Sequence, residues 1–239
     1  MNLAKNLAKK EGNGNMYRSL DAYKNALVKG GRVMKRSKIR FVGVLLLALL
    51  LVGCRSRNSA TINTYTDPSF TKGSIKRIAV FPMANFRAAQ GEARTLERQI
   101  SQSIQRLDPG ISVIGPSEAT AAINEHGLAD KWAEFLRNYT SSGIPNTELL
   151  FQIGDLLGVD AIIQGELVNV LQRDGDYALY LGLTTVTVRY SLFGTDSGLL
   201  LWEASSDARK ETETPLESAP PLIDVILLAQ EKINESLPF

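Results

Sequence analysis

The chain has 239 residues, of which 27 are basic and 25 acidic, with one cysteine and one histidine. Residues 1–53 hold 11 of the basic and 2 of the acidic residues, which leaves 16 and 23 for residues 54–239 and a net charge of −7 there. This balance excludes nucleic acid as an expected partner, and the single cysteine and histidine exclude an internal disulfide, a Cys/His zinc site and a Cys–His nucleophile pair.

Residues 1–33 are polar, rich in lysine and weakly patterned. Met34 begins a seven-residue basic segment, "MKRSKIR", which is a usual length for the start of an export signal. We therefore interpret residues 1–33 as an upstream extension that results from placing the translation start too early, and we take Met34 as the expected start. The alternative is a real cytoplasmic extension that is lost on cleavage.

An apolar run of 12 residues, 41–52, follows the basic segment. It is too short for a helix that spans a bilayer, which needs roughly 20 residues, but it fits the apolar core of a secretory signal. We predict that residues 34–53 are a signal peptide. A buried hydrophobic helix with an incidental cysteine and an uncleaved anchor helix are the alternatives.

The run ends in Leu51, Val52, Gly53 and Cys54, which resemble the lipobox of bacterial lipoproteins. The resemblance implies cleavage before Cys54, diacylglycerol on its sulfur and an acyl chain on its new amino group. It implies no other cofactor. In this family a residue other than Asp after the cysteine favours the outer membrane, and Arg55 is such a residue.

Residues 54–74, "CRSRNSATINTYTDPSFTKGS", are polar and rich in turn formers. We predict a flexible tether, which at this length spans roughly 20–25 Å. A single domain, residues 75–237, is expected to follow it.

The first part of this domain alternates strands and helices. Ile78–Phe81 form a continuous apolar run typical of a strand buried on both faces. Further strands are predicted within 111–116 and 159–172, and helices within 88–107, 116–127, 128–145 and 146–158. The order is β-α-β-α-α-α-β, for which parallel strands with right-handed crossovers are expected.

The pattern changes after residue 173. Residues 178–193 alternate with a period of two, and Thr184, Val186 and Val188 share a face with Tyr190. A second strand, 199–211, follows the turn "GTDSG", and Pro220 and Pro221 precede an apolar helix. The predicted fold class is α/β (α+β mixed): a mixed sheet, whose parallel part is followed by an antiparallel meander and a C-terminal helix.

No catalytic or metal-binding constellation stands out. His126 lies at a predicted helix end, and Asp174 and Asp176 flank a glycine in a turn, where Asp is common for backbone reasons. Asp155 and Asp160 bracket a helix end and a strand start without a predicted cleft. We therefore predict that the protein is not an enzyme and holds no metal.

Two apolar surfaces are candidates for an interface. Trp132, Phe135 and Tyr139 form an aromatic stripe on one predicted helix. Val225 and Leu228 belong to a last helix that is apolar nearly all round, whereas a helix on a sheet needs only a stripe. The sequence leaves two alternatives for these residues: burial within the domain, or contact with a partner or a second copy of the chain.

Three stretches resemble a known group of envelope proteins. "IKRIAVFPM", "LLGVDAIIQGELVNV" and "VRYSLFGTDSGLLLWEAS" are similar to motifs of the TolB amino-terminal domain, the curli-secretion lipoprotein CsgG, the penicillin-binding-protein activator lipoproteins and Neisserial-type surface lipoproteins. The resemblance implies a mixed sheet with helices on its faces and a role in binding or assembly.

We expect a lipid-anchored, non-catalytic accessory or scaffold subunit of a periplasmic or outer-membrane assembly. It would be attached to the periplasmic side of the outer membrane and contact protein partners, including further copies of itself. The alternatives are a CsgG-like secretion-channel subunit and a regulator of peptidoglycan synthesis.

Overall fold

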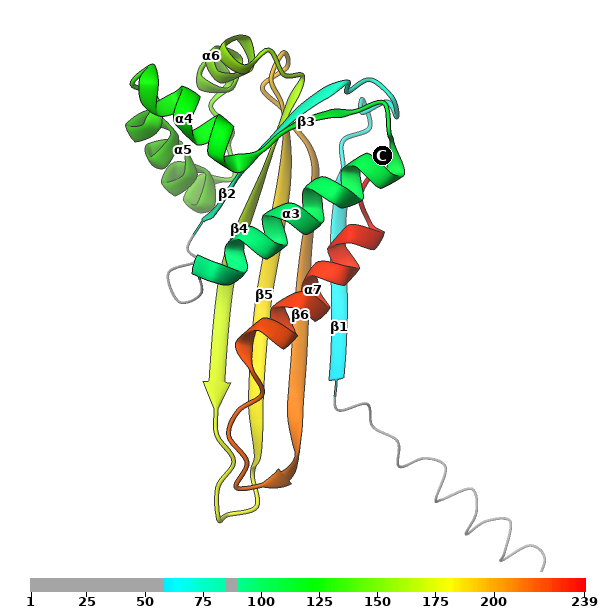
Figure 1. Ribbon diagram of the computed structural model, residues 1–239, viewed down its shortest axis with the longest axis vertical. Coiled ribbons are helices and arrows are strands. Elements are labelled where there is room, and N and C mark those ends of the chain that lie inside the picture. The colour runs from blue at the N-terminus through cyan, green and yellow to red at the C-terminus, as the bar shows by residue number, and fades with distance from the viewer. Residues whose placement is uncertain (1–57, 85–89) are drawn as a thin grey trace, which may run out of the picture. The chain divides into compact units, whose positions relative to one another are not determined.

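A mixed six-stranded sheet organises the residues that the computed structural model describes, 58–84 and 90–239 (Figure 1). The strand order is β1-β6-β5-β4-β2-β3. The strands are β1 (Asn58–Thr66), β2 (Arg77–Ala84), β3 (Ser112–Ile114), β4 (Ala161–Arg173), β5 (Leu181–Gly194) and β6 (Leu200–Pro215). The helices are α3 (Gln90–Leu107), α4 (Pro116–Glu125), α5 (Ala129–Ser142), α6 (Thr147–Leu157) and α7 (Leu222–Glu235). The predicted α/β class is confirmed.

The parallel part of the sheet is built around β2, which pairs with β3 on one side and β4 on the other. Helix α3 connects β2 to β3, and α4, α5 and α6 connect β3 to β4. Ile78–Phe81 are all buried because helices cover both faces of β2. The carboxylate of Asp160 accepts hydrogen bonds from the backbone N–H groups of Lys76 and Arg77, at 2.7 and 2.8 Å, and so fixes the start of β2.

The antiparallel part contains a strand that the sequence did not predict. Strands β4, β5 and β6 form the expected meander, and β1 pairs antiparallel with β6 from Asn58↔Lys210 to Thr66↔Trp202. The prediction of a flexible tether is therefore wrong for residues 58–66. This edge strand has only Ala60 and Ile62 packed against the core, so it lacks the apolar alternation of a typical strand. Its Thr, Ile and Tyr residues nevertheless favour extended backbone.

Two hydrophobic clusters fill the two faces of the sheet. On one face α3 and α7 pack over β2, β4, β5 and β6. On the other face α4, α5 and α6 gather over β2 and the adjoining ends of β4 and β5 (Figure 1). Beyond these three helices the second face carries polar, partly exposed side chains, including Thr185, Thr187 and Asp207. The face under α3 and α7 is therefore covered more completely than the other, although the last six residues of β4 are exposed.

The aromatic stripe of α5 belongs to the second cluster. Trp132 lies 4.4 Å from Phe81 and 4.9 Å from Phe135, measured between ring centroids. Phe135 and Tyr139 both meet Phe193 of β5 edge-on, at 5.4 and 4.9 Å. Trp132, Phe135 and Tyr139 are at most 8% exposed. The aromatic stripe is therefore buried within the domain. The alternative interpretation, in which it contacts a partner, is corrected.

The apolar surface of α7 has the same explanation. Val225 is fully buried, and Leu228 is half-buried against the cluster beneath α3 and α7. The helix needs more than a stripe because it contacts β1, β5 and β6 as well as α3. Val225 thus offers no surface to a partner, which corrects its assignment as an interface residue.

Truncation of Phe135 tests its assignment to the core. Phe135→Ala should lower the free energy of unfolding by about 3–5 kcal/mol, because it removes a buried ring with three ring neighbours. The matched control is Phe151→Ala on α6, where the ring is 57% exposed and a change within about 0.5 kcal/mol is expected. Urea unfolding measures both. If Phe135→Ala lowers the free energy of unfolding only slightly and reduces the oligomeric mass, Phe135 belongs to an interface and not to the core.

Candidate functional site

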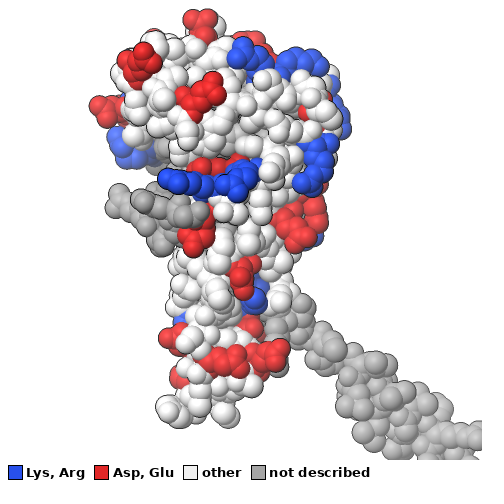
Figure 2. All heavy atoms as spheres, viewed as in Figure 1, with Lys and Arg blue, Asp and Glu red and all other residues white. Residues whose placement is uncertain are grey.

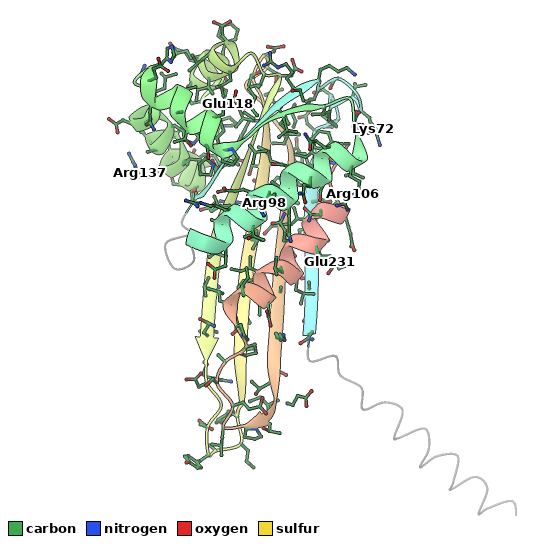
Figure 3. All side chains as sticks on the ribbon, in the orientation of Figure 1. Lys72, Arg98, Arg106, Glu118, Arg137 and Glu231 are labelled. Atoms are coloured by element: carbon green, nitrogen blue, oxygen red, sulfur yellow. The ribbon has the colours of Figure 1, made fainter. Side chains whose placement is uncertain are left out.

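A groove of about 470 Å³ lies between α5 and the partly covered face of the sheet. We call it the polar groove. Its lining residues come from the end of β2, from α5, from β4 and from β5; they are Ala84, Ala133, Leu136, Arg137, Tyr139, Thr140, Gln164, Glu166, Arg189, Ser191 and Phe193. Figure 3 labels Arg137, which reaches the groove from α5. The floor is polar although the neighbouring cluster is aromatic.

Strand register explains why the polar side chains of the floor meet. Glu166 lies opposite Arg189 across β4 and β5, and Ser191 lies opposite both Gln164 and Glu203. Residues directly opposite on neighbouring strands share a face and stand within contact distance. The alternation that buries Val188 and Tyr190 on one face therefore places Arg189 and Ser191 together on the other.

Arg189 and Glu166 form a partly buried ion pair. Their side chains are 23% and 11% exposed, and Nη2 of Arg189 lies 2.5 Å from Oε2 of Glu166. Burial alone would lower the pKa of Arg189, but the hydrogen bond and charge of Glu166, helped by Glu203, raise it. The guanidinium therefore stays charged and is held by the carboxylates around it.

Glu203 of β6 forms a second polar centre beside this pair. Its Oε2 accepts hydrogen bonds from the hydroxyl of Ser191 at 2.8 Å and from the hydroxyl of Tyr139 at 3.2 Å. Burial, followed by the charge of Glu203, raises the pKa of Tyr139 to about 12. Tyr139 thus joins the aromatic cluster to the polar floor and remains protonated at neutral pH.

Gln164 occupies the inner end of the groove. Its Nε2 donates to the carbonyl oxygens of Pro82 and Gly165, both at 2.7 Å. Its Oε1 is buried and has no hydrogen-bond partner among the described residues. The groove could therefore hold a group that donates one hydrogen bond. Ser191 is 4% exposed and donates its hydroxyl hydrogen to Glu203, so its oxygen is largely closed to solvent.

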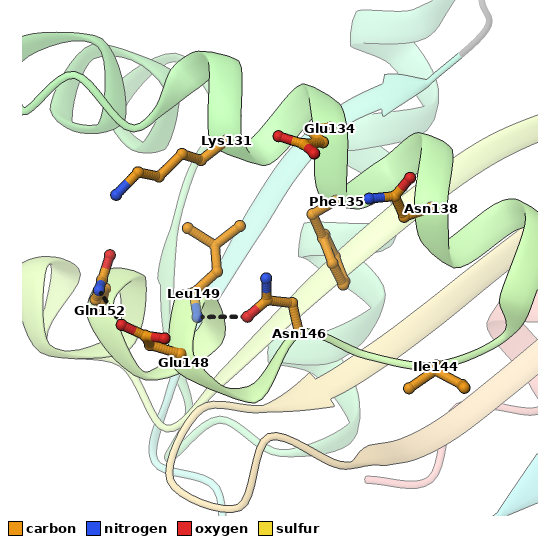
Figure 4. Close-up of a pocket in the computed structure, with 9 residues that line it drawn as sticks. All are labelled: Lys131, Glu134, Phe135, Asn138, Ile144, Asn146, Glu148, Leu149 and Gln152. Atoms are coloured by element: carbon orange, nitrogen blue, oxygen red, sulfur yellow. Dashed lines mark hydrogen bonds between the residues drawn. The ribbon is translucent and has the colours of Figure 1, made fainter.

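A smaller hollow of about 320 Å³ separates α5 from α6 (Figure 4). Its lining residues are Lys131, Glu134, Phe135, Asn138, Ile144, Asn146, Glu148, Leu149 and Gln152. Asn146 caps α6, because its Oδ1 accepts a hydrogen bond from the N–H of Leu149 at 3.0 Å.

The residues singled out in the sequence do not converge on one site. Leu51, Val52, Gly53 and Cys54 lie outside the described residues. His126 is exposed, with its Nδ1 3.0 Å from the carbonyl oxygen of Ala122, and thus ends α4 as expected. Within residues 58–84 and 90–239 no cluster of three or more His, Cys, Asp or Glu side chains could hold a metal ion.

An exposed apolar surface lies at the far end of the long strands. We call it the apolar tip and define it as Tyr177, Leu179, Tyr180 and Leu216. These side chains are 92%, 78%, 57% and 56% exposed. In Figure 2 the lowest part of the visible face is uncharged and lies beyond a band of acidic residues.

Backbone contacts join the two loops of the apolar tip. The N–H of Gly175, in the β4–β5 loop, donates to the carbonyl oxygen of Glu217, after β6, at 2.9 Å. Leu179 and Leu216 have φ angles of 68° and 71°, a left-handed conformation that costs most residues about 1–2 kcal/mol relative to glycine. Both leucines are thus held in a strained backbone with their side chains in solvent.

No helix in the described part of the chain is both long and apolar enough to cross a membrane.

Comparison with known proteins gives no family assignment. No protein-family model matches the chain, and no curated protein gives a significant match. The chain is similar to the PelC dodecamer from Paraburkholderia phytofirmans, with 14% identity over 73% of this chain and 94% of that chain and a TM-score of 0.43. It is also similar to lipoprotein GNA1162 from Neisseria meningitidis, with 17% identity over 67% and 99% of the two chains and a TM-score of 0.42.

A third similar structure is the LpoB C-terminal domain from Salmonella enterica, with 10% identity over 55% of this chain and 81% of that chain and a TM-score of 0.33. The similar structures thus include a bacterial lipoprotein, the kind of protein that the sequence resembles. The finer resemblance to TolB and CsgG stays a prediction. At these identities and TM-scores the likeness supports no argument about activity or partners.

Tyr139 should make the protein less stable at high pH. The pKa of its hydroxyl is raised from 10.0 to about 12, so the folded state keeps a proton that the unfolded chain releases above pH 10. The resulting stabilisation is complete below pH 10 and is lost as the pH rises through 12. Tyr139→Phe should flatten the fall of the unfolding free energy over this range, measured by urea unfolding. Buried Tyr190, whose pKa is also raised, titrates in both proteins. Equal slopes would contradict the assignment.

Glycine substitution tests the strain at the apolar tip. Both substitutions are expected to lower the free energy of unfolding, but Leu179→Gly should lower it by at least about 1 kcal/mol less than Leu199→Gly does. The reason is that only Leu179 has a left-handed backbone conformation. Both changes add the same freedom to the unfolded chain, and Leu199 is also an exposed leucine. Chemical denaturation of the two variants measures the difference. If Leu179→Gly is the more destabilising change, Leu179 is not strained.

Proposed function

We propose that the protein is a lipid-anchored, non-catalytic accessory or scaffold subunit of an assembly in the bacterial envelope. The observation that carries the proposal is the lipobox-like sequence Leu51–Cys54 at the end of a short basic and apolar segment. Cys54 is the only cysteine, so the sulfur that would receive diacylglycerol is unambiguous. A diacylglycerol together with an N-acyl chain would hold the protein firmly, since two or more chains are needed for stable attachment.

The polar groove supports a binding or structural role and not a catalytic one. Two of its charged groups, Arg189 and Glu166, are paired with each other, and the neighbouring Glu203 accepts hydrogen bonds from Tyr139 and Ser191. A general base or nucleophile must instead be free to reach a substrate. We propose no cofactor besides the acyl chains on Cys54. The acidic balance of residues 54–239 argues against nucleic acid as a partner.

Protein partners are the second part of the proposal. The partly covered face of the sheet carries hydroxyl, amide and charged side chains, such as Thr61, Asn63, Thr187 and Asp207, which suit a polar contact with another envelope protein or a second copy. A ring of copies in a secretion channel and a regulator bound to a peptidoglycan synthase remain the alternatives. Arg55, after the lipobox, supports placement on the periplasmic side of the outer membrane.

Lipid labelling tests the anchor. Cells fed labelled palmitate should label the protein, and Cys54→Ala should abolish the label and leave a precursor of higher mass. Mass spectrometry of the mature N-terminal peptide should find an acylated Cys54. An unlabelled protein whose mature N-terminus is not Cys54 would contradict the proposal. Crosslinking in intact cells would then separate a homo-oligomer from a complex with a synthase.

A further inference from the structure

We propose that the apolar tip rests in the headgroup layer of the same bilayer that holds the acyl chains of Cys54. The inference rests on the proposed lipid anchor and adds a second membrane contact, made by Tyr177, Leu179, Tyr180 and Leu216. Three observations lead to it: where β1 begins, how far β5 and β6 continue past that point, and which side chains the end of the sheet exposes.

Covalent geometry keeps Asn58 close to the anchor. Four peptide units join Cys54 to Asn58, and such a chain spans at most about 14 Å. Asn58 is paired with Lys210 of β6, so this limit applies to the folded domain and not to a loose end. The domain cannot stand farther from the bilayer surface than this short link allows.

The apolar tip lies beyond Asn58 on the same end of the sheet. Lys210 is paired in turn with Thr184 of β5, and Leu181 lies three residues farther toward the tip, which is about 10 Å along a strand. The loop with Tyr177 and Tyr180 continues past Leu181 (Figure 1). With the strands upright on the bilayer and the link fully stretched, Leu181 comes within about 4 Å of the level of Cys54. The loop therefore reaches the headgroup layer, which is about 5–7 Å deep.

The chemistry of the apolar tip fits this position. Two tyrosines and two leucines face outward, and tyrosine is enriched where protein meets the membrane interface. The acidic groups of the same loops are turned to the backbone instead. Asp174 accepts a hydrogen bond from the N–H of Ala219 at 2.7 Å, and Asp176 accepts one from the N–H of Ala178 at 2.9 Å.

The strained backbone at Leu179 and Leu216 also supports a membrane contact. Glycine would adopt the left-handed conformation of Leu179 and Leu216 without cost, yet both positions carry a large apolar side chain in solvent. Neither side chain belongs to the two hydrophobic clusters, which leaves both available for a contact outside the domain. The neighbouring carboxylates exclude attraction to anionic lipid as the driving force, so the contact is apolar and should not weaken with salt.

Fluorescence quenching tests the contact. Full-length lipoprotein is reconstituted in phosphatidylcholine vesicles whose acyl chains carry bromine near the glycerol end. The tested variant is Tyr177→Trp, and the matched control is Phe151→Trp, an equally conservative change at an exposed position on α6. Trp132 and Trp202 are buried and give the same background in both. The added emission of Tyr177→Trp should be lost in brominated vesicles at low and high salt, and that of Phe151→Trp should persist.

Vesicle flotation of the same samples separates failure of this inference from failure of the anchor. Protein that floats with the vesicles while Tyr177→Trp keeps its emission overturns the membrane contact and leaves the anchor standing. Protein that stays behind contradicts the lipid anchor itself. Quenching of both variants would also overturn the inference, because the contact would then not be confined to the apolar tip.

Discussion

The pairing of β1 with β6 is the constraint on which the rest of the account depends. It extends the folded sheet to Asn58, four residues from the only cysteine. Without it the domain would begin near Ile75, and a flexible chain of roughly 20 residues would separate it from Cys54. With it, any lipid on that sulfur holds the sheet at a fixed end and at a short distance. An edge strand with few apolar residues thus decides how the domain can meet a bilayer.

The two faces of the sheet have different roles in this arrangement. The face under α3 and α7 holds the larger of the two hydrophobic clusters. The other face changes from the aromatic cluster under α5 to the polar groove and then to an uncovered polar surface. At the groove, Arg189 and Glu166 pair because they lie opposite each other on β5 and β4, and Glu203 lies beside them because it stands opposite Ser191. Such a network favours one register, since a one-residue slip would bury the charges in the core.

Most of the fold follows from local sequence signals. A continuous apolar run identified β2, helical periodicity identified helices such as α3 and α5, Pro220 and Pro221 marked the start of α7, and period-two alternation identified β5. The edge strand β1 was not predicted, because a strand with one solvent-exposed face and an unpaired edge needs few apolar residues. Trp132, Phe135 and Tyr139 could not be assigned to core or interface from periodicity alone. That assignment depends on Phe81 and Phe193, which are distant in sequence. The same alternation places Arg189 and Ser191 on the face opposite Val188 and Tyr190, but their partners on β4 and β6 depend on the strand register. In the apolar tip, Tyr177 was assigned to a turn and Leu179 and Tyr180 to the following strand, which begins only at Leu181.

Neutron reflectometry of the full-length lipoprotein on a supported bilayer tests the central claim most directly, because it measures how far the folded domain stands from the membrane. A short link and an apolar tip predict a protein layer that begins within the headgroup region, with no solvent layer between them. A resolved solvent layer would contradict the contact made by the apolar tip, and one wider than the roughly 14 Å that the link can span would contradict the short link as well.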